Sequence, residues 1–317
     1  MRRISDIDLR LLRVFAAVVE AGGYAVAEPL LNVTSSTISI HISDLEKRLG
    51  FRLCERGRSG FRLTNRGRVV YDEVKQLLSI LDDFAGSITS AGNLLSGRLV
   101  VGTVDGLVTH PGFPLMRTLR RFNALENSVA FELLTESRQD LENGVLDGRI
   151  HAAVGPFVRR ISGLEFSPLF RERHSVYCGP GHPLFSSPQN QKGSAALEAD
   201  WVVLRSYHEA FDRAQFDVTA SRAVVASMEA MLILIRSGLY IGYLPDHYAS
   251  PWVDIGELRE VGRPDLRYTS EHMLITRQTA RQTEAFRVFK TFILEEAEPP
   301  AEDMPETRSA QPAPLGQ

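Results

Sequence analysis

The stretch Thr34–Leu49 constrains the fold most, because it predicts a helix whose two faces differ in chemistry. Thr34 is a good N-cap and Gly50 a C-terminal stop, so both ends of the helix are marked. The apolar positions are spaced by four, three and four residues, which gives one buried stripe. They are Ile38, Ile42, Leu45 and Leu49. The opposite face is small and hydroxyl-rich where a surface helix usually carries Glu and Lys; it holds Ser35, Ser36, Ser39, Ile40 and Ser43.

Two shorter helices are predicted before this one. Asp8–Glu20 has apolar residues near the 3.6-residue period and is stopped by Gly22-Gly23, and Tyr24–Leu31 follows as a second helix. Asn32-Val33 then makes a tight turn. Two helices joined by a short turn, the second with small polar residues at its start, are the pattern of a helix-turn-helix that reads the major groove. A helix packed on a neighbouring domain stays open as the alternative.

The segment directly after this helix is strongly basic, although the whole chain is not. The 317 residues hold 36 Lys and Arg against 39 Asp and Glu, a net charge of −3. Between Phe51 and Arg68 lie six arginines and one acid, Glu55, or six minus one, +5. Strand-like pieces at Phe51–Cys54 and Gly60–Leu63 predict a hairpin wing along the phosphate backbone or in the minor groove. From charge alone, a solvated surface loop is the alternative.

The predicted helix-turn-helix is followed directly by the basic wing. In this arrangement the sequence resembles the LysR-type family of bacterial transcriptional regulators over nearly the whole chain. The motif runs from Leu9 through Gly67. Its most telling parts are Gly22-Gly23-Tyr24, Leu31-Asn32-Val33-Thr34, Ile38-Ser39, Leu45-Glu46-Lys47-Arg48-Leu49-Gly50 and Arg62-Leu63-Thr64-Asn65-Arg66-Gly67. The resemblance implies a winged helix-turn-helix that binds double-stranded DNA. The DNA-binding residues would be Thr34, Ser35, Ser36, Thr37, Ser39, Ile40 and His41 on the helix and Arg52, Arg56, Arg58 and Arg62 on the wing.

The sequence departs from the family pattern at three places. Ala27-Glu28-Pro29-Leu30-Leu31 stands where the family usually has Ala-Ala-x-x-Leu, and Pro29 bends that helix or shortens its start. Ser35-Ser36 stands where many members have Gln-Pro, and Ile40 where they often have Arg. These departures leave the DNA-binding role in place and leave the recognised bases open.

A long helix is predicted over Gly67–Leu95, with a coiled-coil-like apolar seam spaced by four, three, four, three and four residues. The seam residues are Val70, Val74, Leu77, Leu81, Phe84 and Ile88. In the family such a linker helix pairs two subunits, so the resemblance implies a homodimer or homotetramer that presents two DNA-reading helices to a pair of half-sites. A core stripe packed against the C-terminal part is the alternative.

After Ser96-Gly97 strands and helices alternate. The order predicts a parallel sheet with helices on its faces and, from about Phe170, a second α/β unit. Expected strands are Arg98–Gly102, Val129–Leu134, Ile150–Gly155, Ser175–Cys178, Trp201–Leu204, Ala223–Val225, Tyr240–Tyr243 and Met273–Thr276. Expected helices are Leu115–Asn123, Gln139–Asp147, Ser227–Arg236 and Thr283–Glu296. A chain that crosses twice between two lobes is organised like the periplasmic binding proteins, which matches the family's effector domain.

The expected fold class is therefore α/β, with an all-α-dominated winged helix-turn-helix at the N-terminus and a two-lobe, periplasmic-binding-protein-like effector domain at the C-terminus. The expected divisions are a DNA-binding domain at 1–66, a dimerisation helix at 67–97, lobe I at 98–170 and 276–297, lobe II at 171–275, and a tail at 298–317. The tail is rich in proline and acids, so we expect it to be disordered.

A two-lobe sensor binds its ligand outside the carboxyl ends of the strands, where helix N-termini offer N–H groups to an anion. We therefore expect a small-molecule effector, for which an organic acid fits best, while neutral ligands stay open. By position, the effector-binding candidates are Thr103, Asp105, Gly106, Ser137, Arg138, Ser206, Ser227 and Tyr243. The same polar side chains are equally suited to capping helices.

Other functional classes find little support in the sequence. There is no G-x-S-x-G, Walker A or H-E-x-x-H sequence, so no catalytic residues, cofactor or metal are expected. Cys178 and His182 are two potential ligands without a third nearby, and the stretch between them suits a turn. Two distant cysteines and no apolar run of about 18 residues favour a cytoplasmic protein without a membrane partner. A stand-alone sensor whose N-terminal helices contact protein, and an α/β catalyst with a regulatory appendage, remain as alternatives.

Overall fold

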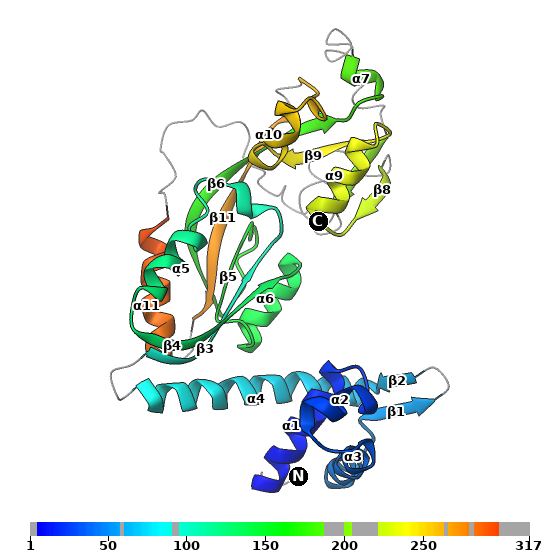
Figure 1. Ribbon diagram of the computed structural model, residues 1–317, viewed down its shortest axis with the longest axis vertical. Helices are drawn as coiled ribbons and strands as arrows, with labels where there is room; N and C mark the ends of the chain where they lie inside the picture. Colours follow the sequence, from blue (N-terminus) through cyan, green and yellow to red (C-terminus); the bar gives the residue numbers. More distant parts are fainter. Residues whose placement is uncertain are drawn as a thin grey trace, which may run out of the picture. The chain divides into compact units, whose positions relative to one another are not determined.

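The computed structural model divides into two compact units, Met1–Ile88 and Thr89–Gln317, and each is described by itself (Figure 1). The residues that the structure describes are 5–57, 60–90, 95–186, 200–204, 221–262, 266–278 and 282–297. The predicted tail at 298–317 lies outside them.

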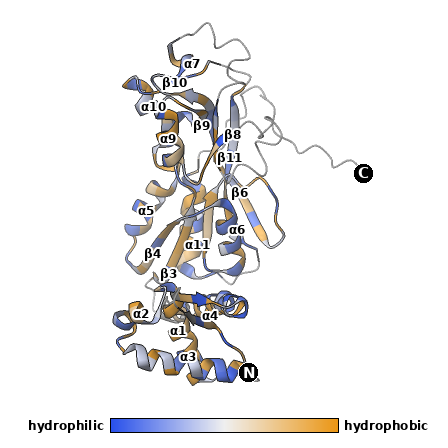
Figure 2. Ribbon diagram, turned by 90° about the vertical axis from the view of Figure 1, so that its right-hand side faces the viewer, coloured by the Kyte–Doolittle hydropathy of each residue, from blue (hydrophilic) through white to orange (hydrophobic). Residues whose placement is uncertain are grey.

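The first unit is built from helices and one hairpin. Its elements are α1 (Asp6–Glu20), α2 (Tyr24–Leu31), α3 (Ser35–Leu49), β1 (Cys54–Gly57), β2 (Gly60–Leu63) and α4 (Asn65–Ser90). The predicted bounds of α2 and α3 are confirmed. The Thr34 hydroxyl accepts the Thr37 N–H at 3.4 Å, and Gly50 ends α3 in the left-handed region at φ +82°. Figure 2 shows hydrophobic and hydrophilic residues alternating along α3, as its sequence predicts.

The core of this unit forms where α1 and α3 pack together. Ile38, Ile42 and Leu45 are 0%, 2% and 0% exposed, so the predicted stripe is buried. At the edge of this core the buried Asp8 carboxylate accepts the Ser5 N–H at 2.8 Å and pairs with Arg48 at 2.9 Å. The first turn of α1 is thereby joined to the last turn of α3.

Helix α4 differs from its prediction in bounds and in packing. It starts at Asn65 and ends at Ser90, and Leu95, predicted as its last residue, begins the next strand. Part of the predicted seam is buried in the core of its own unit, including Val70, Val74 and Leu77. The first unit is therefore able to cover the start of this stripe, which belongs to the same hydrophobic core as the buried residues of α1 and α3. Further along the helix, Phe84 is 58% exposed.

The second unit holds a nine-stranded mixed sheet with the order β4-β3-β5-β11-β6-β9-β7-β8, and β10 pairs with β6 (Figure 1). The strands are β3 (Leu95–Thr103), β4 (Asn127–Thr135), β5 (Ala152–Gly155), β6 (Leu164–Cys178), β7 (Trp201–Leu204), β8 (Ser221–Val225), β9 (Ile241–Pro245), β10 (Arg259–Glu260) and β11 (Tyr268–Arg277). The helical elements are η1 (Leu107–Thr109), α5 (Leu115–Asn123), α6 (Arg138–Asp147), α7 (Pro183–Ser186), α9 (Met228–Arg236), α10 (Asp246–Asp254) and α11 (Glu284–Glu295).

In the first lobe, β4, β3 and β5 run parallel, as predicted. Successive residues of β3 point to opposite faces, so Leu99 and Val101 join the core under α5 and α11, while Val100 joins the core under α6. The middle of this strand, Leu99–Val101, is an unbroken apolar run because both of its faces are covered by helices.

The chain passes between the lobes on two long antiparallel strands, β6 and β11. Only their ends were predicted, as Ser175–Cys178 and Met273–Thr276, because buried polar residues interrupt the apolar pattern in the middle of each strand. Helix α10 was also missed, since it contains Pro251. Among the described residues, no helix is both long and apolar enough to span a membrane.

Candidate DNA-binding face and ligand cleft

The hydroxyl face of α3 is open to solvent at the start of the helix. Thr34 and Ser36 are exposed, and the Thr34 hydroxyl lies 2.8 Å from that of Ser36. Ile40 is 61% exposed, one turn further on. The four other predicted contacts, Ser35, Thr37, Ser39 and His41, are half-buried. The structure thus gathers all seven predicted helix residues on the first two turns of α3, which is the part of a recognition helix that meets base edges.

Two carboxylates that were not predicted fix the ends of α3. The Glu28 carboxylate on α2 accepts the Ser35 N–H at 2.5 Å. Hydrogen bonds from Ser35 lower the pKa of Glu28. At the other end, Glu46 accepts the N–H groups of Leu53 and Cys54 at 2.7 and 3.1 Å. Nothing in the sequence marked these acids as partners of backbone groups.

The wing is a two-stranded antiparallel hairpin, but its first strand begins later than predicted. That strand was expected at Phe51–Cys54 and lies at Cys54–Gly57, with Glu55 opposite Arg62. The reason is that Leu53 is fully buried and its N–H is taken by Glu46, so the chain before Cys54 is not free to pair.

The wing arginines are only partly within the described residues. The side chains of Arg52 and Arg62 are exposed, whereas Arg58 and the side chain of Arg56 lie outside what the structure describes.

The wing joins α4 through a close backbone approach at Gly67. A Cβ at Gly67 would lie 2.0 Å from the Leu53 carbonyl oxygen, so only glycine fits. Thr64 completes the junction: its hydroxyl accepts the Gly67 N–H at 2.8 Å and donates to the Arg52 carbonyl at 2.9 Å. This explains why the sequence Thr64-Asn65-Arg66-Gly67 follows the second strand of the wing.

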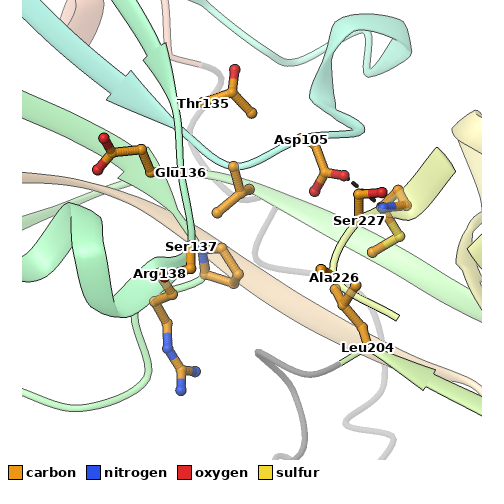
Figure 3. Close-up of a pocket in the computed structure, with 11 residues that line it drawn as sticks. Asp105, Thr135, Glu136, Ser137, Arg138, Leu204, Ala226 and Ser227 are labelled. Carbon is orange, nitrogen blue, oxygen red and sulfur yellow. Dashed lines mark hydrogen bonds between the residues drawn. The ribbon is translucent and has the colours of Figure 1, made fainter. Parts of the chain in front are cut away.

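In the second unit a cavity of about 210 Å³ opens between the two lobes (Figure 3). The lobe I lining comes from the loops after β3, β4 and β5, and the lobe II lining from the end of β7 and the loop between β8 and α9. The lining residues are Val104, Asp105, Thr135, Glu136, Ser137, Arg138, Pro156, Leu204, Ala226, Ser227 and Met228. Thr103 pairs with Thr135 in the sheet, so the loops after β3 and β4 leave the same edge.

Two helices begin at this cavity, one from each lobe. Ser137 is the N-cap of α6 and accepts the Asp140 N–H at 3.2 Å. Ser227 is the N-cap of α9 and accepts the Ala230 N–H at 3.2 Å. Both serines therefore line the cavity and cap a helix at the same time.

Asp105 connects the two lobes directly. Its carboxylate accepts the Met228 N–H at 2.6 Å, the first amide of α9. Burial raises the pKa of Asp105, and this hydrogen bond opposes the rise. Figure 3 shows the Asp105 carboxylate directed toward Ser227, while the side chains of Glu136 and Arg138 extend away from it.

The structure does not bring every predicted effector residue to this cavity. Thr103 is buried and its hydroxyl donates to the Val104 carbonyl at 3.1 Å. Gly106 packs against Met228, and Tyr243 lies within lobe II beside Trp201 and Tyr268. These three were placed by loop position, which does not tell which side of a loop faces the ligand. Ser206 lies outside the described residues.

The apolar lining residues, such as Pro156, Leu204 and Met228, were missed because nothing distinguishes a cavity wall from a core in sequence.

A buried cluster of one carboxylate and three histidines lies where the strands cross between the lobes. Glu172, on β6, is 1% exposed and contacts the Nε2 atoms of His174, His247 and His272 at 2.8, 2.7 and 3.0 Å. Burial by itself would raise the pKa of Glu172, but His174 and His272 hold it well below 4.5. The histidines are scattered in sequence, so no spacing predicted this cluster.

Among the described residues, no group of three or more His, Cys, Asp or Glu side chains is arranged to hold a metal ion. Cys178 and His182 have separate structural partners instead. The Cys178 thiol donates to the Arg259 carbonyl at 3.6 Å, and the His182 ring accepts the Leu184 N–H at 3.2 Å. Burial raises the pKa of Cys178 to about 11, so the thiol stays protonated.

A winged helix-turn-helix joined to a two-lobed α/β unit with an interlobe cavity defines a ligand-responsive DNA-binding regulator. The model of the "Bacterial regulatory helix-turn-helix protein, lysR family" matches residues 9–68, and that of the "LysR substrate binding domain" matches residues 92–298. The chain therefore belongs to the LysR family of bacterial transcriptional regulators.

Relatives with assigned roles agree with this placement. The HTH-type transcriptional activator BauR of Pseudomonas aeruginosa is 37% identical over 280 residues, covering 88% of this chain and 92% of BauR. The HTH-type transcriptional regulator LinR of Sphingobium indicum is 27% identical over 263 residues, covering 77% and 84% of the two chains. These relatives are regulators, and this chain is likewise a DNA-binding regulator with an effector-binding domain, not an enzyme.

Solved structures of full-length regulators share the fold. The LysR family regulator CbnR aligns with a TM-score of 0.66 at 20% identity, covering 92% of this chain and 99% of CbnR. CbnR in complex with its target DNA aligns with a TM-score of 0.62 at 18% identity, covering 91% and 99%.

Proposed function

We propose that this regulator binds promoter DNA as a homodimer or homotetramer in the cytoplasm and responds to a small organic acid bound between its two lobes. The observation that carries the effector part is the convergence of two capped helix N-termini, one from each lobe, on a cavity of about 210 Å³.

The proposed DNA contacts follow from the open hydroxyl face of α3 and the basic wing. Small side chains let a helix lie deep in the major groove, and hydroxyls donate to or accept from base edges and phosphates. The contacts are Thr34, Ser35, Ser36, Thr37, Ser39, Ile40 and His41 on α3 and Arg52, Arg56, Arg58 and Arg62 on the wing. The arginines contribute affinity for any sequence, because phosphates are alike everywhere on DNA.

The proposed effector contacts are Asp105, Ser137, Arg138 and Ser227. The first amide of α9 is already occupied by the Asp105 carboxylate, which shows the kind of group that this helix end accepts. A carboxylate of the effector therefore lies at the N-terminus of α6, beside Ser137 and Arg138, while the rest of the molecule reaches the lobe II wall. A ligand held by both lobes favours one lobe arrangement over another, which is the requirement for a response.

The proposed division into domains keeps α4 as the element that pairs two subunits. Ile80 and Phe84 are 54% and 58% exposed beyond the part of the helix that the first unit buries, which leaves apolar surface for a partner helix. The divisions are 1–66, 67–97, lobe I at 98–170 with 276–297, lobe II at 171–275, and the tail at 298–317. The shift in strand register between His272 and Met273 supports a lobe boundary close to 275.

A thermal-shift experiment on the full chain tests the effector part. Both tryptophans, Trp201 and Trp252, lie in the second unit, so their fluorescence reports its unfolding alone. We expect at least one member of a panel of small mono- and dicarboxylic acids, each at millimolar concentration, to raise the melting temperature. The corresponding amides should not raise it. Ser137→Ala and Ser227→Ala should each reduce the shift.

A matched control separates ligand contact from helix capping. Thr283 caps α11 by accepting the Phe286 N–H at 3.2 Å and does not line the cavity. Thr283→Ala and Ser137→Ala each lose a cap, at a cost of about 1 kcal/mol, but only Ser137→Ala should lose the ligand shift. If Ser137→Ala kept the full shift, the cavity would not be the effector site. If the amides stabilised as well as the acids, the ligand class would be wrong and the site would stand.

A further inference from the structure

The contact between Glu28 and the start of α3 has a consequence for DNA recognition. Glu28 lies on α2, and its carboxylate accepts the N–H of Ser35, the first residue of α3, at 2.5 Å. The turn between the two helices contains Asn32 in the left-handed conformation at φ +53°. Glu28 thus joins the helix before the turn to the helix after it, and so fixes the direction in which α3 starts.

The same contact places a permanent negative charge at this helix end. Hydrogen bonds from Ser35 lower the pKa of Glu28, so the side chain is ionised at neutral pH. A carboxylate is also favoured there by the partial positive charge of the helix N-terminus. The residues on either side of Ser35, Thr34 and Ser36, carry exposed hydroxyl groups that lie 2.8 Å apart.

In helix-turn-helix complexes the N-terminal residues of the second helix meet base edges, and the first helix crosses the phosphate backbone. Glu28 lies where these two elements meet. Its charge repels phosphates that approach the start of α3. Its carboxylate also accepts the hydrogen bond of the Ser35 N–H, which is then not available to a phosphate. On a non-operator duplex, which is held by phosphate contacts, both effects weaken binding. On an operator, the fixed start of α3 also favours the base contacts of that helix, which offsets part of this cost.

We propose that Glu28 is a specificity-determining residue: it positions the start of α3 and lowers affinity for non-operator DNA more than for operator. This rests on the proposed DNA-binding face of α3. Glu28 acts through Ser35 and through its charge, so it is a positioning residue that needs no base contact of its own.

The test compares two variants with different losses. Glu28→Gln removes the charge and keeps an oxygen that accepts the Ser35 N–H, while Glu28→Ala removes both. The operator probe is the duplex most enriched from a randomised library by the wild-type full chain, and the reference is a scrambled duplex of equal composition. Glu20→Gln is the control, because it removes an exposed carboxylate at the end of α1 with the same change in net charge.

For Glu28→Gln we expect roughly two- to fivefold tighter binding to the scrambled duplex at low salt, with a smaller change for the operator. The salt slope on the scrambled duplex should steepen by at most about one, the value of one added phosphate contact. Glu28→Ala should lose further discrimination because operator binding also weakens. Glu20→Gln should leave the ratio of operator affinity to scrambled-duplex affinity unchanged.

The possible outcomes distinguish a failure of the role proposed for Glu28 from a failure of the DNA-binding face proposed on α3. Equal changes on both duplexes for Glu28→Gln, or no change beyond that of Glu20→Gln, would overturn the role of Glu28. Ser39→Ala is measured in the same titration. If Ser39→Ala alters operator binding while Glu28→Gln alters nothing, the face stands and this proposal fails; if neither alters binding, the face itself is wrong.

Discussion

The two units hold their carboxylates in different ways. In the first unit, Asp8, Glu28 and Glu46 accept backbone N–H groups from residues three to eight positions away in sequence, and the Asp8–Arg48 pair adds one contact over 40 positions. In the second unit, Glu172 accepts from His247 and His272, which are 75 and 100 positions away. Local bonds fix the winged unit element by element. Bonds between distant residues form in the two-lobed unit only once its sheet has formed. We therefore expect the loss of one such bond, at Glu172, to lower the stability of the whole second unit.

The largest effect is expected at the close approach of the wing to α4. Gly67→Ala places a Cβ 2.0 Å from the Leu53 oxygen, and we expect a loss of about 3 kcal/mol in the stability of the first unit and loss of DNA binding. Tryptophan fluorescence should show the second unit melting as before.

Gly50→Ala is the matched control for that substitution. Gly50 has a positive φ of +82°, which Gly67 does not, and no atom lies within 4 Å of its Cβ position, so the cost at Gly50 is the backbone term alone, about 1 kcal/mol. Equal losses for the two alanines in urea titrations followed by circular dichroism would contradict the steric explanation.

The second prediction concerns the distant contacts of Glu172. Glu172→Gln leaves buried histidine N–H groups without their charged acceptor, and we expect a loss of about 3 kcal/mol in the tryptophan-monitored stability of the second unit. Glu165→Gln on the same strand is the control, because Glu165 is half exposed and pairs with Lys290, a contact expected to contribute at most about 1 kcal/mol. A Glu165→Gln loss as large as that of Glu172→Gln would show that burial of the cluster is not the cause.

The ionisation of Glu172 also predicts how the stability of the second unit depends on pH. The pKa of Glu172 is lower in the folded chain than its ordinary value of 4.5. Its contribution is therefore fully present above pH 4.5 and is lost as the pH falls toward the folded value. We expect the wild-type second unit to lose stability below about pH 4.5 more steeply than Glu172→Gln. Parallel curves in urea titrations between pH 3 and 7 would contradict this assignment.

The smallest effect is expected at Asp105. Burial raises the pKa of Asp105, whereas the pKa of Glu172 is lowered. A raised folded pKa means that the ionised group lowers stability at neutral pH, and that stability is gained as the pH falls through the folded value. Asp105→Asn removes the charge and keeps an oxygen for the Met228 N–H, so we expect a gain of under about 1 kcal/mol at pH 7. The measurement is the urea midpoint of tryptophan fluorescence. A clear loss instead would mean that the charge is needed to hold α9.

The accuracy of prediction from sequence follows the same division between local and distant contacts. Thr34 and Gly50 marked the ends of α3 because capping depends on residues only a few positions away. Ser137 and Ser227 were found for the same reason, since each caps the helix that starts after it. The first strand of the wing was misplaced by three residues, because its start is set by Leu53 and Glu46, which meet only in the folded unit.

By itself, the sequence determined the order of the principal strands and helices apart from α10, the buried stripe of α3 and the edge of the sheet where the cavity opens, since periodicity, capping and strand direction are local properties. Only the tertiary structure decided that Glu28 binds Ser35, that Asp105 bridges the lobes and that Glu172 gathers three histidines. A polar residue has the same local signature whether it faces water or a buried partner. Its role depends on which distant group the fold brings within hydrogen-bonding distance.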